Sequence, residues 1–239
     1  MSTNSTYWAV VPAAGVGRRM GSDIPKQYLM LSGRRVIEHT LQRLLDHPQI
    51  RQTLVALSPD DEWWPDTDYA NHADVIAVDG GAERCHSVLH ALDRLREMAA
   101  DDDWVLVHDA ARPCLRSADL DALIEQLSDH PAGGILGVPV RDTMKRADES
   151  GQIAETVCRE GLWHAFTPQM FRLGILRSAL SQALEQGMQV TDEASAVELA
   201  GHPSRLIEGH PGNIKITRPE DLALAAFYLL EPRSLSDLG

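Results

Sequence analysis

Short apolar runs alternate with longer amphipathic segments along most of this 239-residue chain. The run Trp104–Val107 is apolar at every position, as expected of a strand buried on both faces of a parallel sheet. This alternation predicts an α/β fold: a three-layer, mostly parallel, Rossmann-like sheet whose ligands bind at the carboxyl ends of strands. The predicted strands cover 8–11, 53–57, 75–78, 104–107, 134–140, 205–208 and 213–216, and the predicted helices cover 36–46, 83–98, 117–128, 173–186 and 192–200, with a last helix after a capping box at Thr217 and Glu220.

The first predicted strand leads into a turn of small residues and then into a group of cations. Residues 12–17 read PAAGVG, so a ligand can approach backbone N–H groups that larger side chains would screen. Arg18 and Arg19 offer planar forks for phosphate oxygens, whereas Lys26 is a compact point charge. This pattern indicates a nucleotide-phosphate site.

Two better-known phosphate loops do not fit this segment. A dinucleotide fingerprint would need a third glycine where Met20 stands, and the chain contains no Gly-Lys-Ser or Gly-Lys-Thr for a Walker loop. The alternative to a phosphate site is an ordinary strand-to-helix turn with a solvated basic face.

Polar residues also follow two later strands. Asp109 comes just after the run 104–107, where it could hold Mg²⁺ on phosphates or contact a sugar hydroxyl; the alternative is a cap on the next turn. Arg112 could bind an anion or pair with Asp109. The glycine pair 80–81, followed by Ser87, could admit the edge of a base or ribose, or could form only a tight turn.

Three further polar residues lie in the last third of the chain. Alternation in the predicted strand 213–216 places Lys215 on the face opposite its isoleucine neighbours, in solvent or in a polar cleft. Thr167 and Thr191 lie at element junctions, where such residues ordinarily act as caps.

The stretch 141–166 interrupts the alternation of strands and helices. Two polar, β-compatible runs flank the turn sequence 148–151, which predicts a hairpin projecting from the core. Because the hairpin has few apolar residues, it cannot be stable by itself, and we expect it to pack on a second subunit. The alternative is a mobile surface loop. The rest of the chain, 1–239, is expected to form a single domain.

Composition excludes several classes of protein. A net charge of −13 disfavours nucleic acid and anionic membranes, and no apolar stretch is long enough to span a membrane. The three cysteines and ten histidines form no spaced zinc motif and no disulfide framework. The first residues lack a basic segment and a cleavage site, which predicts a cytoplasmic protein.

Several motifs occur in order and cover nearly the whole chain: PAAGVGRRM (12–20), PKQYL (25–29), GGAER (80–84) with Ser87, VHDAARPC (107–114), VRDTMKR (140–146), TPQMF (167–171), TDEAS (191–195) and NIKITRPEDLALA (213–225). Together they resemble those of the 2-C-methyl-D-erythritol 4-phosphate cytidylyltransferases of isoprenoid biosynthesis. The resemblance implies a glycosyltransferase-A-like nucleotidyltransferase fold, a homodimer joined by the projecting arm, CTP and methylerythritol phosphate as substrates, and Mg²⁺ as cofactor.

The resemblance also assigns roles to residues. Arg19, Lys26 and Lys215 would meet the triphosphate as the catalytic cations. Cytosine and ribose would be held by Pro12, Ala13, Ala14, Gly15, Gly81, Ser87 and Ala110, and the sugar phosphate by Asp109, Arg112, Thr167 and Thr191, with Thr143 and Arg159 from the neighbouring subunit's arm. Two positions depart from the family pattern, because Ala82 and Gly212 stand where relatives often carry an acid.

The implied reaction suits these residues. The substrate's phosphate is already a nucleophile, so the obstacle is repulsion between anions, which cations relieve. The sequence is also compatible with three alternative functions. They are a ribitol-phosphate or other cytidylyltransferase of the same fold, a nicotinamide-dependent oxidoreductase, and a catalytically silent nucleotide-binding subunit.

Overall fold

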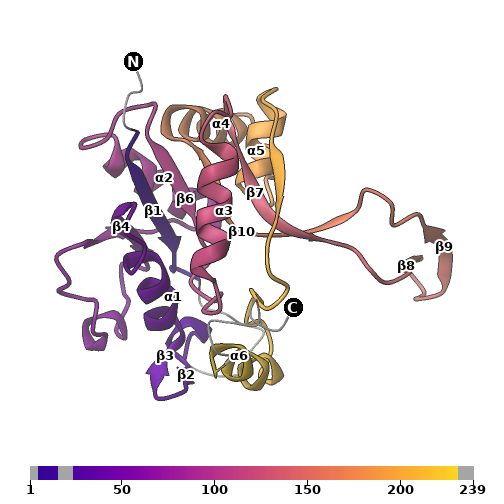
Figure 1. Cartoon of the computed structure of the whole chain (residues 1–239), viewed down its shortest axis with the longest axis horizontal. Coiled ribbons are helices and arrows are strands. Elements are labelled where there is room, and N and C mark those ends of the chain that lie inside the picture. Colours follow the sequence, from indigo (N-terminus) through magenta and orange to yellow (C-terminus); the bar gives the residue numbers. More distant parts are fainter. Residues whose placement is uncertain (1–4, 16–23, 231–239) are drawn as a thin grey trace.

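A computed structural model describes residues 5–15 and 24–230 of the chain. Within these residues, seven strands form one sheet in the order β11-β7-β10-β6-β1-β4-β5 (Figure 1). Neighbouring strands run parallel except β10, which is antiparallel to both β6 and β7. The strands are β1 (Tyr7–Pro12), β4 (Ile50–Leu57), β5 (Val75–Asp79), β6 (Trp104–Val107), β7 (Gly133–Pro139), β10 (Trp163–Arg172) and β11 (Arg205–Glu208). The predicted α/β class is confirmed.

Helices cover both faces of the sheet because alternate residues of its central strands face opposite cores. Ala9 and Val11 of β1 pack in one core with α1 and α3, whereas Trp8 and Val10 pack in the other with α2, α4 and α5. These helices are α1 (Val36–Leu45), α2 (Arg84–Leu95), α3 (Ser117–Leu127), α4 (Leu173–Glu185) and α5 (Glu193–Leu199). All five lie within a few residues of their predicted bounds.

Smaller elements complete the sheet's carboxyl edge. A short hairpin of β2 (Met30–Leu31) and β3 (Arg34–Arg35) precedes α1, and α6 (Glu220–Leu230) packs beside it through a third apolar cluster. Two 3-10 turns, Lys26–Tyr28 and Trp64–Asp66, lie in the connections that follow β1 and β4.

Two local predictions are wrong, and one strand was missed. The pattern did not reveal β10, because Thr167-Pro168 interrupts its apolar residues and the β7 pairing shifts register between Ala165 and Gln169. Residues 213–216 form no strand; instead, the Ile216 N–H donates to the carbonyl of Ala111.

The predicted capping box uses a different acid. The Thr217 hydroxyl and the N–H groups of Thr217 and Arg218 all donate to Asp221, and Glu220 does not reach back to Thr217. The helix start was therefore found correctly near Thr217, but the carboxylate that satisfies its first N–H groups lies one residue later.

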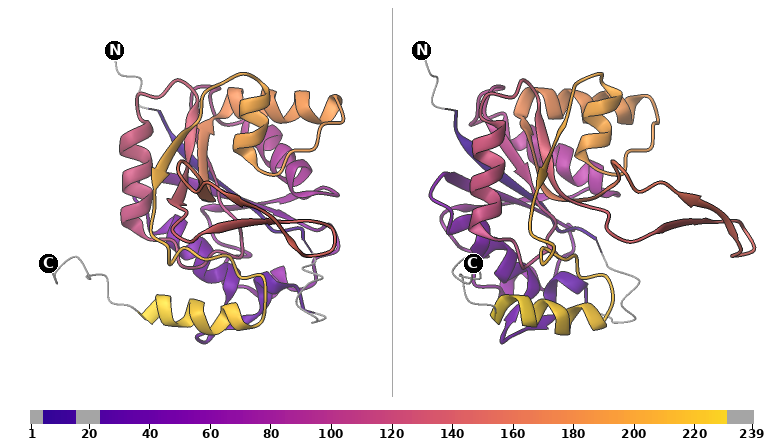
Figure 2. Two further views of the ribbon diagram at one scale, coloured as in Figure 1. Left: turned by 90° about the vertical axis from the view of Figure 1, so that its right-hand side faces the viewer. Right: turned by 45° about the vertical axis from the view of Figure 1, so that its right-hand side comes forward.

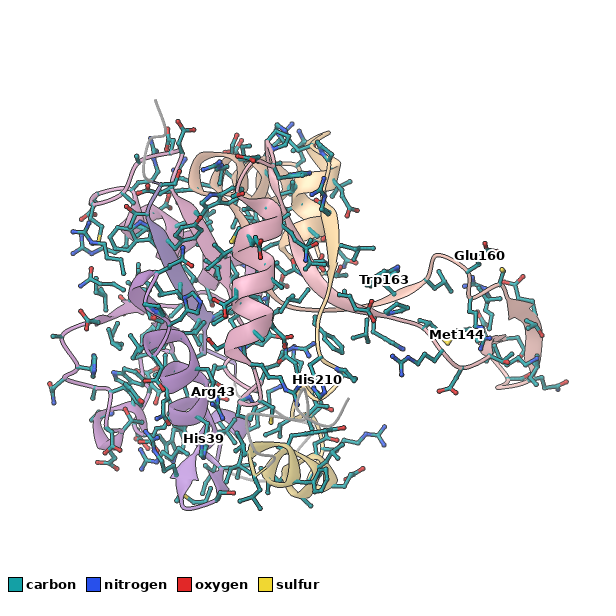
Figure 3. All side chains as sticks on the ribbon, in the orientation of Figure 1. His39, Arg43, Met144, Glu160, Trp163 and His210 are labelled. Atoms are coloured by element: carbon teal, nitrogen blue, oxygen red, sulfur yellow. The ribbon has the colours of Figure 1, made fainter. Side chains whose placement is uncertain are left out.

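The predicted hairpin at 141–166 is present as an arm that extends away from the sheet (Figures 1 and 2). At its end, β8 (Met144–Ala147) pairs antiparallel with β9 (Ile153–Val157). Most of its residues are exposed, and Ile153 keeps 68% of its surface in solvent. Figure 3 shows Met144 and Glu160 out on this arm, with Trp163 nearer its base.

Candidate active site

A cavity of about 180 Å³ opens where β1, β5 and β6 end. Its walls come from five stretches of the sequence, 12–15, 26–27, 81–87, 109–111 and 215. The lining residues are Pro12, Ala13, Ala14, Gly15, Lys26, Gln27, Gly81, Ala82, Glu83, Arg84, Ser87, Asp109, Ala110, Ala111 and Lys215. The carboxyl edge of a parallel sheet is the expected place for a ligand in this architecture.

The small-residue turn after β1 is held in place by a buried glutamine. Gln27 is 3% exposed, and its Nε2 donates to the carbonyls of Ala13 at 2.7 Å and Gly15 at 3.1 Å. The Ala13 N–H continues the β1 ladder to Ala56. Sequence reasoning missed Gln27; its position beside Lys26 in the same motif was the only available signal.

The glycine pair lies directly against this turn. A Cβ on Gly80 would come within 2.5 Å of the Ala14 Cβ, so the two loops approach more closely than a larger residue would allow. Ser87 is buried, and its hydroxyl accepts from the Gly81 N–H at 3.0 Å while donating to the Glu83 carbonyl at 3.2 Å. Ser87 therefore fixes the loop that forms one wall of the cavity.

Three cations surround the carboxylate of Asp109. The distances are 3.0 Å from Arg84 Nε to Oδ1, 2.8 Å from Lys215 Nζ to Oδ2, and 3.5 Å from Arg112 Nε to Oδ2. Burial by itself raises the pKa of Asp109, but these cations outweigh burial and hold it well below its usual range. Asp109 is thus a permanent anion, and its side chain does not serve as a turn cap.

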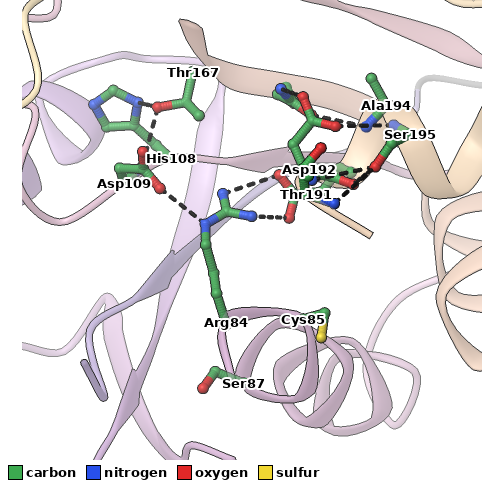
Figure 4. Close-up of polar contacts among 12 residues, drawn as sticks. Arg84, Cys85, Ser87, His108, Asp109, Thr167, Thr191, Asp192, Ala194 and Ser195 are labelled. Carbon is green, nitrogen blue, oxygen red and sulfur yellow. Dashed lines mark hydrogen bonds and ion pairs between the residues drawn. The ribbon is translucent and has the colours of Figure 1, made fainter. Parts of the chain in front are cut away.

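Arg84 links Asp109 to a second buried acid. Its Nη1 and Nη2 lie 2.5 and 3.0 Å from the two carboxylate oxygens of Glu193, which is 1% exposed (Figure 4). Burial raises the pKa of Glu193, and the charge of Arg84 opposes that rise. The sequence did not reveal that Arg84 and Glu193 form a pair, because 109 positions separate them. Each residue by itself resembles an ordinary charge at the end of a helix.

A buried chain of hydrogen bonds sets the backbone of Asp109. The His108 ring is fully buried, with Nε2 3.0 Å from the Arg112 carbonyl and Nδ1 2.9 Å from the Thr167 hydroxyl (Figure 4). Burial lowers the pKa of His108 to about 4, so the ring is neutral. Because a carbonyl only accepts, Nε2 carries the proton and the Thr167 hydroxyl donates to Nδ1. The same hydroxyl accepts from the Asp109 N–H at 3.1 Å.

With this geometry in place, comparison with known proteins identifies the family. The family model described as 2-C-methyl-D-erythritol 4-phosphate cytidylyltransferase matches residues 7–231. The chain belongs to that family.

Individual relatives agree with this assignment. The chain is 58% identical over 221 residues to the 2-C-methyl-D-erythritol 4-phosphate cytidylyltransferase of Vibrio vulnificus strain YJ016, covering 92% of this chain and 93% of the relative. A solved structure of the Francisella tularensis cytidylyltransferase is 36% identical with a TM-score of 0.82, covering 94% and 100% of the two chains. A crystal structure described as 4-diphosphocytidyl-2C-methyl-D-erythritol synthase is 40% identical with a TM-score of 0.83, covering 95% and 100%.

The residues expected from this cytidylyltransferase family fall into two groups. All seven expected cytosine and ribose contacts line the cavity, together with Lys26, Asp109 and Lys215. Arg19 lies outside the described residues. Thr143 and Arg159 are exposed and adjoin Met144 and Glu160 on the arm, apart from the cavity of their own chain (Figure 3).

Of the other residues expected to bind the sugar phosphate, Arg112 and Thr167 are buried within the chain and Thr191 is exposed. Arg112 is 7% exposed; its Nη1 donates to the Asn213 carbonyl at 2.6 Å, and its guanidinium lies 4.8 Å from the Phe166 ring centre. Thr167 is also buried, whereas Thr191 is exposed and lines a neighbouring hollow beside Arg84.

The two departures from the family pattern have different surroundings. Ala82 is exposed on the cavity wall, so the chain lacks an acid there without losing a packing contact. Gly212 is buried, and a Cβ on it would lie 2.9 Å from the Tyr228 ring. An acid at position 212 would therefore require this part of the chain to move.

Asp109 does not fit the role of a direct Mg²⁺ ligand. Both of its oxygens are occupied by cations, and three positive charges at 2.8 to 3.5 Å would repel a divalent ion placed beside them. The charges around Asp109 therefore oppose its predicted role as a metal ligand. Its carboxylate instead holds Lys215 and Arg84 at the cavity wall and pairs with the buried Arg112.

None of the helices in the part of the chain that the structure describes is long and apolar enough to cross a membrane.

Proposed function

We propose that this protein transfers CMP from CTP to 2-C-methyl-D-erythritol 4-phosphate, giving 4-diphosphocytidyl-2-C-methyl-D-erythritol and pyrophosphate in the non-mevalonate isoprenoid pathway. Family membership supports both substrates. The observation that carries the proposal is one cavity that joins the small-residue turn, Lys26, Asp109 and Lys215 at the carboxyl edge of the sheet.

The reaction needs positioning and charge rather than proton transfer. An oxygen of the methylerythritol phosphate attacks the α-phosphorus of CTP, and the bond from that phosphorus to the bridging oxygen breaks in line. Pyrophosphate leaves with the bond's electron pair. The nucleophile is already an anion, so no side chain has to remove a proton, and cations lower the repulsion between the reactants.

The two lysines on the cavity wall supply that charge. Lys26 lies in the 3-10 turn that follows β1, and Lys215 precedes Ile216, whose N–H donates to the carbonyl of Ala111 in the loop after β6. Asp109 holds the Lys215 ammonium at 2.8 Å, so the cation is oriented before the nucleotide arrives. Charge that builds up on the α-phosphate in the transition state then meets donors that need little reorganisation.

The direct test is pyrophosphate release. Purified protein with CTP, Mg²⁺ and methylerythritol phosphate should release pyrophosphate and form the cytidine diphosphate product, while ribitol 5-phosphate as acceptor should give little. Absence of pyrophosphate with methylerythritol phosphate would reject the proposal. Turnover with ribitol 5-phosphate but not with methylerythritol phosphate would instead show that the alternative acceptor is the substrate.

We also propose that the reaction requires Mg²⁺, with the phosphates of CTP as its ligands. The cations around Asp109 leave no place for the ion on that carboxylate, so the phosphate oxygens are left to bind it. Chelation of Mg²⁺ should abolish turnover, and Asp109→Asn should leave the Mg²⁺ concentration for half-maximal rate unchanged.

A homodimer joined by the arm forms the last part of the proposal. The arm buries little apolar surface by itself and leaves Ile153 and Leu162 exposed. In a two-fold dimer each arm would reach the partner, so that Thr143 and Arg159 would complete the other subunit's sugar-phosphate site. A cytoplasmic location stays a prediction from the N-terminal sequence.

A further inference from the structure

Three side chains that could ligate a metal ion lie together at the start of α2, and one of them, Glu83, also lines the cavity. Glu83, Cys85 and His86 offer a carboxylate, a thiol and an imidazole whose ligand atoms all lie within 4.8 Å of one another. Among the residues that the structure describes, no other group of three such side chains meets this geometry. The catalytic proposal uses none of the three side chains.

The spacing of the three donors suits a tetrahedral ion. Cys85 Sγ lies 3.8 Å from Glu83 Oε2 and 3.8 Å from His86 Nδ1. Two ligands of a tetrahedral Zn²⁺, one sulfur and one nitrogen, are about 3.5 Å apart when the metal bonds have their usual lengths. Small side-chain movements would therefore bring all three donors onto one ion.

There is also room for a fourth ligand. Glu83 and Cys85 line a hollow of about 140 Å³ that lies next to the cavity and also contacts Thr191 and Asp192. A water molecule in this hollow could complete the coordination shell, as it does in zinc sites with three protein ligands.

The local charges favour a bound cation, although the three donors lie at the N-terminus of α2, which is partly positive. The first turn of α2 carries roughly half a positive charge, whereas Glu83 and a Cys85 thiolate together carry two negative charges. The guanidinium of Arg84 is directed toward Asp109 and Glu193, which compensate its charge (Figure 4). The thiol proton would leave to solvent when the metal binds.

We propose that Glu83, Cys85 and His86 bind Zn²⁺, and that the bound ion inhibits the enzyme by displacing the loop that holds the nucleotide. The ion would exchange with solvent, unlike a structural zinc ion. The three residues do not form one of the spaced structural zinc motifs, which the sequence lacks.

The coupling to the nucleotide loop follows from the contacts of the same residues. The Glu83 carbonyl accepts from both the N–H and the hydroxyl of Ser87, and that hydroxyl accepts from the Gly81 N–H. Gly81 also packs so closely on His86 that a Cβ on it would lie 2.3 Å from the His86 Cβ. A metal that draws Glu83 and His86 together would therefore move Gly81, which lines the cavity. Zn²⁺ should raise the KM for CTP.

Binding can be tested without nucleotide. Co²⁺ titrated into the full chain should give a thiolate-to-cobalt absorption band at one ion per chain, and Zn²⁺ should abolish it by displacement. The matched control is Cys158→Ser, which removes the exposed thiol of the arm and should leave the band intact. Cys85→Ser should abolish it.

A second variant guards against misfolding, since Cys85 is buried. His86→Asn, at a half-buried position, should weaken Co²⁺ binding by at least about tenfold. A band that survives in Cys85→Ser, that disappears in Cys158→Ser, or that never forms in the unmodified protein would overturn the metal site.

Inhibition is tested separately with Mg²⁺ held in large excess. Micromolar Zn²⁺ should raise the KM for CTP in the unmodified enzyme and in Cys158→Ser, but not in His86→Asn. Equal inhibition of all three proteins would reject the coupling, because Zn²⁺ would then act on the nucleotide or on another site.

Discussion

At the scale of single residues, the site depends on which charges are compensated. The sequence singled out Lys26, Lys215 and Asp109 as candidate site residues, because each follows a predicted strand or lies within a motif, and all three line the cavity. It could not show that Asp109 holds three cations, since Arg84 and Lys215 reach it from segments 25 and more than 100 positions away. Only folding brings these charges together.

Removal of a catalytic lysine should act on the chemical step. We expect Lys26→Ala to lower kcat by a factor of roughly 10²–10³, because one preorganised donor to the transition state contributes about 3–4 kcal/mol. The KM for CTP should change much less. Steady-state kinetics decide the matter: a change confined to KM would mean that Lys26 binds substrate and transition state equally.

Arg84 should be needed for stability as well as for the position of Asp109. Arg84→Met leaves the buried Glu193 carboxylate without its partner, so we expect a loss of about 3 kcal/mol in the free energy of unfolding. Urea denaturation measures this loss. Adding Glu193→Gln removes the uncompensated charge and should restore part of it; a double variant no more stable than Arg84→Met would contradict the buried ion pair.

His108 should make the fold sensitive to acid. Its pKa is about 4 in the folded chain and about 6.5 when unfolded, so the unfolded state binds more protons between these values. Stability should therefore rise by about 3 kcal/mol as pH increases from 4 to 6.5, and then level off.

The measurement compares the urea midpoint as a function of pH in the unmodified protein and in His108→Gln. Glutamine keeps one hydrogen-bond donor and one acceptor. The unmodified protein should show the steeper pH dependence of urea midpoints across this window. His90→Gln, at an exposed position, is the control and should behave like the unmodified protein. Parallel curves for all three proteins would show that His108 does not titrate as its burial indicates.

At the scale of elements, hydrophobic periodicity predicted most helices and parallel strands. It failed where tertiary contacts replace a local pattern. The strand β10 contains Pro168 and a shifted register. Residues 213–216 are held by local backbone hydrogen bonds to His210 and Gly212 and by one bond to Ala111, rather than by a strand ladder. The arm was predicted because its polar, β-compatible runs lack a buried face.

The contact between the two nucleotide loops gives an element-scale prediction. Gly80→Ala would place a Cβ 2.5 Å from the Ala14 Cβ and 2.9 Å from the Leu57 carbonyl oxygen, so the loops must separate. We expect a higher KM for CTP. The double variant Gly80→Ala with Ala14→Gly removes the closer clash and should recover part of the affinity; no recovery would show that the loops do not meet in this way.

At the scale of the whole molecule, the arm determines whether one chain contains a complete site. If Thr143 and Arg159 serve the partner's cavity, Lys26→Ala and Arg159→Ala disable different halves of a shared site. Random subunit exchange between the two variants should restore about a quarter of normal activity, because half of the dimers are mixed and each has one intact site of two.

The control for this experiment mixes Lys26→Ala with Lys215→Ala. Both changes affect the same cavity, so exchange cannot rebuild a complete site and activity should stay low. Pyrophosphate release is measured after mass spectrometry confirms that mixed dimers have formed. Equal activity in the two mixtures, or none in either, would count against an arm that completes the neighbouring site.

The sequence alone determined the α/β class, the small-residue turn and the presence of the arm, because these depend on local periodicity and on residue size. Tertiary structure alone decided that Arg84 joins Asp109 to Glu193, that Thr167 donates to His108, and that Glu83, Cys85 and His86 face one another beside the cavity. Local pattern records what a segment buries, whereas the charge and proton state of a group depend on neighbours that only the folded chain supplies.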